Sequence, residues 1–535
     1  MRKLFLISCV MALSAPAFAQ TIDAKGADEL ANTLSKYVGK TALKNGILKV
    51  APEADGYRIT FSTDAFLKAM PKQDLLKGSL GEYSILTKPL ADGTWNVTSG
   101  NMPSAAFEVS GPKGPESFQW SVDDGSWTGL FDPKIGTFST STFAYDAFKL
   151  SLKSAEQDID ASASAAKGQM LATAAASGGV DLNMTQSFAN FNETIVTKLP
   201  NLDAASDEGE AAKTETPKTE TPAAGEPVKV TLRSSELGSV AEGKGLRNRE
   251  LMDLWAFVIA HVDEKKLNKA GQDELKQKLK AALPLWDKLK GEYHFKDFAV
   301  ETPLGNFAAQ NISQETNLDG ISKDGAYHYA MRTNGLKYPA LPIPEWGVPF
   351  LPTDVELVIG TAGVDLDTVV KGAIDDMDLN REKVLSEEFE AATAAQFLVA
   401  PPKLVISKSL VRTADAELTV EGEMTFTGLK PASHTTWEMA GFDKVVERLN
   451  KAAETDAEIK NYITFVKLAK DFGTEVDGGR VRWVVDQKAD GSVAINGNPV
   501  KGPDPVVEPG SDDTMDVPAP EDEEDNPDAQ TDKAQ

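Results

Sequence analysis

The stretch that most constrains the fold is residues 416–427, A-E-L-T-V-E-G-E-M-T-F-T, in which apolar and polar residues alternate without a break. This period of two is typical of a β-strand with one buried apolar face and one solvent-exposed polar face. At about 3.3 Å per residue, such a strand would span roughly 40 Å. Because a strand of this length is stable only inside a large sheet, the pattern predicts a large antiparallel β-sheet.

Shorter alternating stretches recur along the chain, for example at residues 57–61, 118–122 and 480–486, with Asp-Gly turn signals between them. Amphipathic helical patterns are inserted between these strands. These patterns cover residues 23–40, 246–261, 264–283, 366–377, 381–398, 442–453 and 456–471. We therefore expect an α+β fold with one or more large, curved, mainly antiparallel sheets. The Ala- and Ser-rich residues 154–180 fit closely packed strands or a helical interruption equally well.

The first residues have the character of an export signal. Arg2 and Lys3 precede the apolar residues 4–13, and Ala17-Phe18-Ala19 places small residues where a signal peptidase reads them. We expect residues 1–19 to be a signal peptide cleaved after Ala19, which directs the protein to the periplasm or the outside of the cell. A lipobox-like segment at Cys9 is preceded by too short an apolar core, so lipidation is not favoured.

Two acidic segments divide the rest of the chain. Residues 201–227 repeat Thr, Glu and Pro, and residues 499–535 contain twelve acidic residues against Lys501 and Lys533. Such composition predicts a disordered linker and a disordered tail. The linker separates a β-rich region, residues 20–200, from an α+β region, residues 228–498. The linker either joins two separate domains or is a disordered loop that leaves and re-enters one continuous sheet, and the sequence is compatible with both interpretations.

The net charge of −26 argues against nucleic acid and anionic membrane surfaces as partners. After residue 19, no apolar run approaches the length of about 18 residues that a membrane-spanning helix needs, so we expect no transmembrane segment. The four histidines include His294 and His328, which lie in predicted strands among aromatic residues. We expect neighbouring residues in the sheet to satisfy the hydrogen-bonding groups of these two side chains. The sequence predicts no catalytic residue, no metal ligand and no cofactor.

One acidic segment has a partial calcium-loop pattern. Asp376, Asp378, Asn380 and Glu387 follow the spacing of oxygen ligands in an EF-hand loop. Arg381 stands where that loop needs glycine, and its charge opposes a cation. An acidic connection between two helices is the favoured interpretation.

The candidate binding residues come from two apolar stretches. Residues 338–352, which we call the Pro-rich loop, contain five prolines and many large apolar residues. This loop fits either a lip that touches a lipid or partner protein, or a packed crossover that covers one end of the sheet, and the crossover is favoured. The candidate residues are Leu341, Ile343, Trp346 and Phe350 in the loop, and Leu418, Val420, Met424 and Phe426 in the long strand.

A segment near the C-terminus, residues 490–500, reads D-G-x-V-x-I-N-G-x-P-V. Together with the export signal and the long alternating strands, it resembles uncharacterised periplasmic β-rich proteins of Gram-negative bacteria, and more loosely the AsmA-like envelope proteins. The resemblance implies a large curved antiparallel sheet and a role at the cell envelope. It provides no catalytic residue to carry over.

These observations favour a non-enzymatic exported protein whose sheet binds a lipid, another hydrophobic ligand or an envelope partner. One alternative is a structural or interaction module without a ligand. The other is a hydrolase that acts through paired carboxylates, which would need two converging carboxyl groups, one with a raised pKa. The oligomeric state is left open.

Overall fold

The structure is a computed structural model, and it describes residues 22–69, 76–79, 82–100, 104–111, 114–198, 227–427, 430–454, 456 and 459–505. The expected signal peptide, nearly all of the expected linker and most of the expected tail lie outside these residues.

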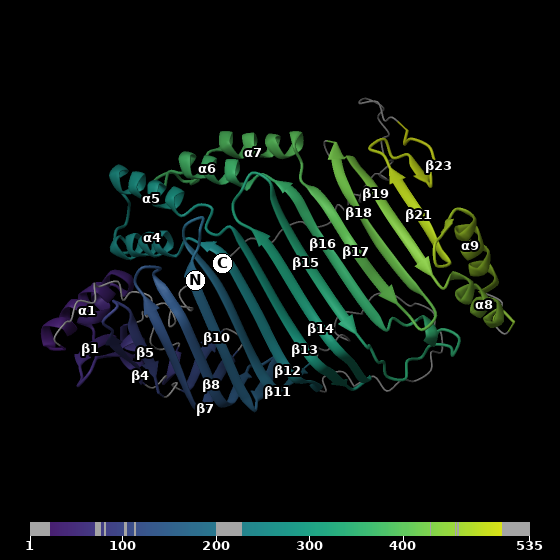
Figure 1. Ribbon diagram of the computed structural model, residues 1–535. Helices are drawn as coiled ribbons and strands as arrows, with labels where there is room; N and C mark the ends of the chain where they lie inside the picture. Colours follow the sequence, from purple (N-terminus) through teal and green to yellow (C-terminus); the bar gives the residue numbers. More distant parts are fainter. Residues whose placement is uncertain are drawn as a thin grey trace, which may run out of the picture.

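Most of the described chain forms antiparallel strands (Figure 1). The strands before residue 199 are β1 (Leu48–Pro52), β2 (Tyr57–Ser62), β3 (Leu76–Ser79), β4 (Glu82–Pro89), β5 (Trp95–Ser99), β6 (Ala105–Gly111), β7 (Gly114–Asp132), β8 (Thr137–Lys153), β9 (Gln157–Ala163), β10 (Ala165–Ala174) and β11 (Val180–Lys198). Those after residue 226 are β12 (Pro227–Leu246), β13 (Lys288–Thr302), β14 (Gly305–Asp319), β15 (Gly325–Asn334), β16 (Asp354–Val364), β17 (Lys403–Arg412), β18 (Glu417–Thr427), β19 (Lys430–Ala440), β20 (Thr474–Val476), β21 (Arg480–Gln487), β22 (Val493–Ile495) and β23 (Asn498–Lys501).

The strands pair into one sheet whose spatial order nearly follows the chain. The order runs β1, β2, β4, β5, β7, β8, β10, β11 and then from β12 to β19 in sequence, followed by β21, β22 and β23. The long strands β7, β8 and β11 have room for a second partner along their length, so β6 pairs with β7, and β9 lies between β8 and β11.

The sheet continues across the expected linker. β11 and β12 pair from Val180 opposite Leu246 to Lys198 opposite Pro227, which makes them the two arms of one long hairpin. The segment between them is therefore an insertion at a hairpin end of a continuous sheet. The regions before and after the expected linker therefore share one sheet.

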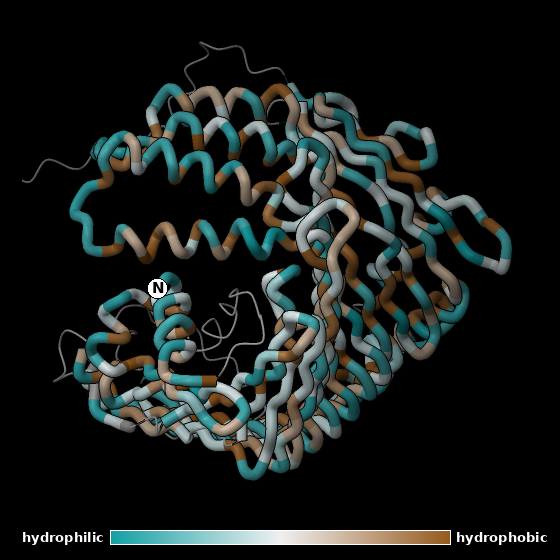
Figure 2. Tube along the Cα trace, turned by 60° about the vertical axis from the view of Figure 1, so that its left-hand side comes forward, coloured by the Kyte–Doolittle hydropathy of each residue, from teal (hydrophilic) through white to brown (hydrophobic). Residues whose placement is uncertain are grey.

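Helices occupy the connections at the ends of the strands. They are α1 (Ala24–Val38), α2 (Lys40–Lys44), α3 (Thr63–Ala69), α4 (Asn248–Ala260), α5 (Lys269–Ala281), α6 (Leu366–Asp376), α7 (Glu387–Val399), α8 (Phe442–Ala452), α9 (Ile459–Asp471) and the 3-10 turn η4 (Val348–Phe350). Because the strands alternate in direction, α4 to α7 gather at one end of the strands, while α8 and α9 lie at the other (Figure 1). The helices lie on one side of the sheet (Figure 2).

Directly paired residues identify which face the terminal helices cover, because partners in adjacent strands point to the same side. One unbroken row of partners crosses the sheet from Tyr57 in β2 to Val485 in β21. The row is Tyr57, Thr87, Val97, Gly129, Ser141, Met170, Met184, Ala241, Gly291, Thr316, Tyr329, Ile359, Ile406, Gly422, Thr435 and Val485. Tyr57 packs in the core beneath α1, and Val485 faces α8 and α9, so these helices cover opposite ends of the same face.

The N-terminal core explains the position of α1. Leu30 and Leu34 are buried against Tyr57, Trp95 and Val97 of the sheet, as the apolar spacing of residues 23–40 predicts. The helical patterns predicted after residue 240 are likewise confirmed as α4 to α9, although the pattern at residues 381–398 becomes helical only at Glu387.

The Ala- and Ser-rich residues 154–180 include two strands, β9 and β10. The polar strand β14, which contains few β-branched residues, was not predicted, and neither was β19. Both are central strands whose partners on each side hold them in the sheet. In such positions, pairing outweighs the weak intrinsic preference of the sequence.

Candidate functional site

The two faces of the C-terminal half of the sheet differ in chemistry. On one face, which we call the ionic face, charged side chains pair across the strands. Glu417 on β18 accepts hydrogen bonds from Arg412 (2.7 Å) and Arg480. These bonds, with that from Arg412 contributing most, hold the pKa of Glu417 below its usual value. Further cross-strand pairs on this face are Arg332–Glu356, Arg332–Glu315, Lys290–Glu315, Lys403–Glu423, Arg482–Glu438 and His434–Asp486.

The opposite face, which we call the apolar face, exposes large apolar side chains to solvent. The register places them on the side covered by α1, α8 and α9. They are between 36% and 57% exposed: Tyr293, Met331, Leu357, Ile359, Leu404, Val411 and Trp437. From β13 to β19, the strand spacing gives this surface a width of about 30 Å.

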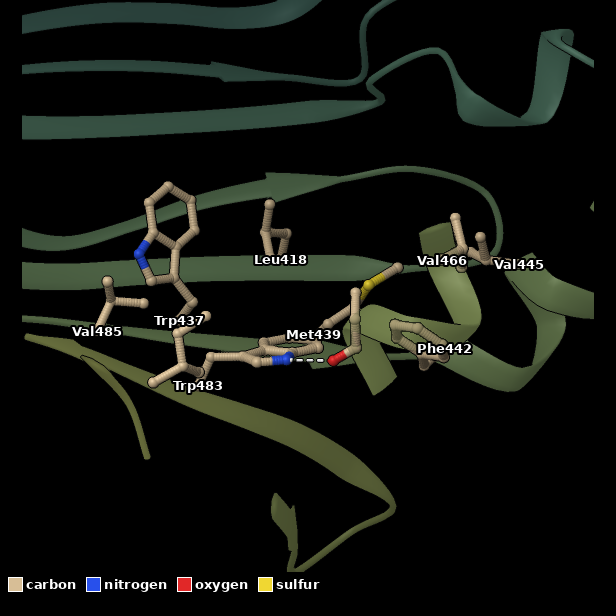
Figure 3. A pocket seen from close by; sticks show the side chains of 10 residues that line it. Leu418, Trp437, Met439, Phe442, Val445, Val466, Trp483 and Val485 are labelled. Atoms are coloured by element: carbon tan, nitrogen blue, oxygen red, sulfur yellow. Dashed lines mark hydrogen bonds between the residues drawn. The ribbon is translucent and has the colours of Figure 1, made fainter. Parts of the chain in front are cut away.

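A pocket lies where the apolar face meets α8 and α9 (Figure 3). We call it the end pocket. Its volume is about 440 Å³. Its walls are apolar, and they include Leu418, Trp437, Met439 and Trp483 from the sheet together with Phe442 and Val466 from the helices.

The polar atoms of the two tryptophans are paired within the protein. The Trp483 indole N–H donates to the Ala469 carbonyl oxygen at 2.7 Å, and that of Trp437 donates to Thr435 Oγ1 at 3.1 Å. The pocket therefore presents mainly carbon surface to an occupant, which favours apolar ligands over polar ones.

Polar contacts fix the helices that form the pocket wall. Arg448 on α8 pairs with Asp415, in the turn before β18, at 2.5 Å. Asn496, after β22, donates to the Phe472 carbonyl at 2.8 Å and accepts from the Val484 amide at 2.8 Å. Asn496 and Gly497 both have positive φ, as a tight hairpin turn requires. The segment at residues 490–500 thus has a structural role, because it anchors the C-terminal end of α9 to the sheet.

None of the candidate residues of the Pro-rich loop lines the end pocket, and one of them, Trp346, lies beside α8 and α9. Trp346 packs against the core between these helices, where Ile459 and Ile463 are buried, and Phe350 lies 6.4 Å from the Trp346 ring. Leu341 is half-buried, and Ile343 is 36% exposed. The loop therefore supports the helices that form the pocket wall.

The candidate residues of β18 share the apolar face. Leu418 lines the end pocket, and Val420 lies directly opposite Trp437. Met424 lies between Leu404 and Ser433, and Phe426 lies opposite Pro431. All four are half-buried, so the protein covers this face only in part. Trp437 and Trp483 were not predicted as site residues, because their strands become adjacent only through the pairing of β19 with β21.

The remaining chemical candidates have local partners. His294 Nε2 lies 3.3 Å from Glu236 in the adjacent strand. The Asp376 carboxylate accepts from the Ser386 amide (2.6 Å) and hydroxyl (2.8 Å), and its pKa is lowered chiefly by the bond from that amide. Asp376 thereby holds Ser386, the residue that caps the N-terminus of α7.

The pKa shifts of the described carboxyl groups all have the same direction. Every Asp or Glu among them whose pKa is shifted has a lowered pKa. A general acid in a glycosidase-type pair needs a raised one. In the same part of the chain, no group of three or more His, Cys, Asp or Glu side chains is arranged to hold a metal ion.

Comparisons with family models, curated proteins and solved structures gave no match to this chain. None of the helices among the described residues combines the length and apolar character needed to cross a bilayer.

Proposed function

We propose that this protein binds a lipid, or another ligand with a long hydrocarbon chain, along the apolar face, with the end pocket holding one end of that chain. In this proposal the sheet is curved, with the apolar face on its inner side. The protein acts without catalysis, as an exported protein of the cell envelope, in keeping with the signal-like residues 1–19 and the resemblance to AsmA-like proteins.

The observation that carries the proposal is the exposure of the apolar face between its two covered ends. Apolar surface exposed to water costs about 25 cal/mol per Å² relative to burial, and large contiguous patches are uncommon on soluble proteins without a binding role. Here Met331 and Leu357 are direct partners in adjacent strands, and both are exposed. Leu404 is exposed beside the half-buried Met424.

The end pocket favours a hydrocarbon chain over a protein segment. A peptide brings main-chain N–H and C=O groups that need hydrogen-bond partners, and the carbon-lined walls provide few. A hydrocarbon chain has no such requirement and gains about 0.8 kcal/mol for each buried CH₂ group. The pocket volume of about 440 Å³ also falls within the range of small-molecule sites.

The experiment is native mass spectrometry of the purified full chain, followed by titration with a fluorescent fatty acid delivered from cyclodextrin. Leu404→Gln changes the apolar face, and Lys403→Gln changes the adjacent exposed residue on the ionic face. Because the Lys403–Glu423 pair is exposed, its loss has little effect on stability. We expect about tenfold weaker binding for Leu404→Gln and unchanged binding for Lys403→Gln, in line with the loss of one buried apolar side chain.

A protein that carries no lipid after purification and takes up no fatty acid would contradict the proposal, and would favour a structural module. Equal affinities of the two variants would show that the fatty acid binds somewhere other than the apolar face.

A further inference from the structure

Helix α9 carries a second exposed apolar surface, next to the end pocket. Tyr462, Phe465 and Leu468 are 66%, 70% and 50% exposed. We call these three residues the outer arc of α9. At 100° per residue they project from one side of the helix, which is separate from the side that buries Ile459 and Ile463. A short helix that exposes two aromatic rings and a leucine has an apolar side that no other described part of the chain covers.

The outer arc is continuous with the pocket wall. Val466 and Ala469 of the same helix line the end pocket, and Ala469 lies on the helix surface between Tyr462 and Phe465. The outer arc therefore adjoins the pocket at Ala469, and its own side chains face solvent.

We propose that the outer arc of α9 docks on the surface of a lipid bilayer, which places the end pocket beside the source of its ligand. This inference rests on the proposed function. Amphipathic helices bind in the interfacial region with aromatic and leucine side chains on the inserted face and charged side chains on the face toward water.

The size of the surface favours a bilayer over a protein partner. Three side chains fall far short of the roughly 800 Å² that each partner buries in a stable protein interface, whereas a few inserted side chains suffice for reversible attachment to a membrane. The charged side chains of α9 do not obstruct such insertion, because Lys460 and Lys467 project from the side of the helix opposite Phe465.

The test is co-sedimentation of the full chain with phosphatidylcholine vesicles, with and without phosphatidylglycerol. Phe465→Asp removes the most exposed ring of the outer arc. Thr464→Asp adds the same charge at the adjacent exposed position, on the polar side of the helix. We expect Phe465→Asp to weaken vesicle binding at least about tenfold, and Thr464→Asp to have a much smaller effect.

Loading of fatty acid from cyclodextrin separates this proposal from the proposed function, because it involves no bilayer. The proposal is supported if Phe465→Asp loads normally from cyclodextrin but no longer sediments with vesicles. It is overturned if the wild-type protein fails to sediment with either vesicle, or if Phe465→Asp and Thr464→Asp sediment equally well. Failure of the wild-type protein to load from cyclodextrin would instead contradict the proposed function.

Discussion

Trp483 on β21 donates its indole N–H to the main-chain carbonyl of Ala469 on α9, at 2.7 Å. This bond joins a helix of the pocket wall to the floor of the pocket. The Trp483 ring also lies 6.0 Å from the ring of Phe442, the first residue of α8. One side chain thus contacts both helices, and the shape of the end pocket depends on it.

Replacing Trp483 by Phe keeps an aromatic ring but removes the bond to Ala469. We expect a loss of about 1 kcal/mol in the free energy of unfolding, since that is the net contribution of a typical hydrogen bond. We also expect faster amide hydrogen exchange in α9, measured by mass spectrometry, because the helix loses an anchor.

Trp437→Phe is the matched control. Its indole bonds to Thr435 within the same strand, so its loss should leave exchange in α9 unchanged. Equal exchange in α9 for the two variants would show that the Trp483–Ala469 bond does not anchor the helix.

Filling the end pocket should block binding without disturbing the anchor. In Ala469→Trp the added ring would occupy the pocket, while the main-chain carbonyl remains available to Trp483. We expect fatty-acid affinity to fall by at least about tenfold, equal to roughly 1.4 kcal/mol. Lys467→Trp adds the same ring to the polar side of the same helix and should bind normally. Unchanged affinity in Ala469→Trp would place the ligand outside the pocket.

The Glu417 contacts predict how stability responds to pH. Arg412 and Arg480 lower the pKa of Glu417 in the folded protein relative to the ordinary value of about 4.3 in the unfolded chain. Stability from this group is therefore present above that ordinary value, and it is lost as the pH falls through the lower folded pKa.

We expect Glu417→Gln to cost roughly 1–2 kcal/mol in the free energy of unfolding at neutral pH, by urea denaturation. The difference from wild type should shrink below about pH 4, because the carboxyl group of the unfolded wild-type chain then takes up a proton that the folded protein does not yet bind. A difference that stays constant down to about pH 3 would show that lost packing, rather than lost charge, explains the effect.

The sequence predicted the features that arise from local patterning. The alternation around Leu418 identified β18, and the spacing of Leu30 and Leu34 identified α1. It did not predict β14 or the pairing that brings Trp437 opposite Trp483. Both features depend on contacts between strands, and local sequence patterns do not report such contacts. In the Pro-rich loop, the sequence identified Trp346 as a candidate binding residue, and in the structure this half-buried side chain packs against the core of the α8–α9 pair.

The sequence by itself determined that the long strands have one apolar and one charged face, because side chains alternate along any strand. Only the tertiary structure decided which parts of the apolar face are covered. That depends on where the connecting helices pack. Helix α1 covers Tyr57 and Trp95, and α8 and α9 cover Leu418. Leu357 and Leu404, which lie between these two regions, are exposed. Helix packing here joins residues tens of positions apart, and the periodicity of a single strand carries no information about it.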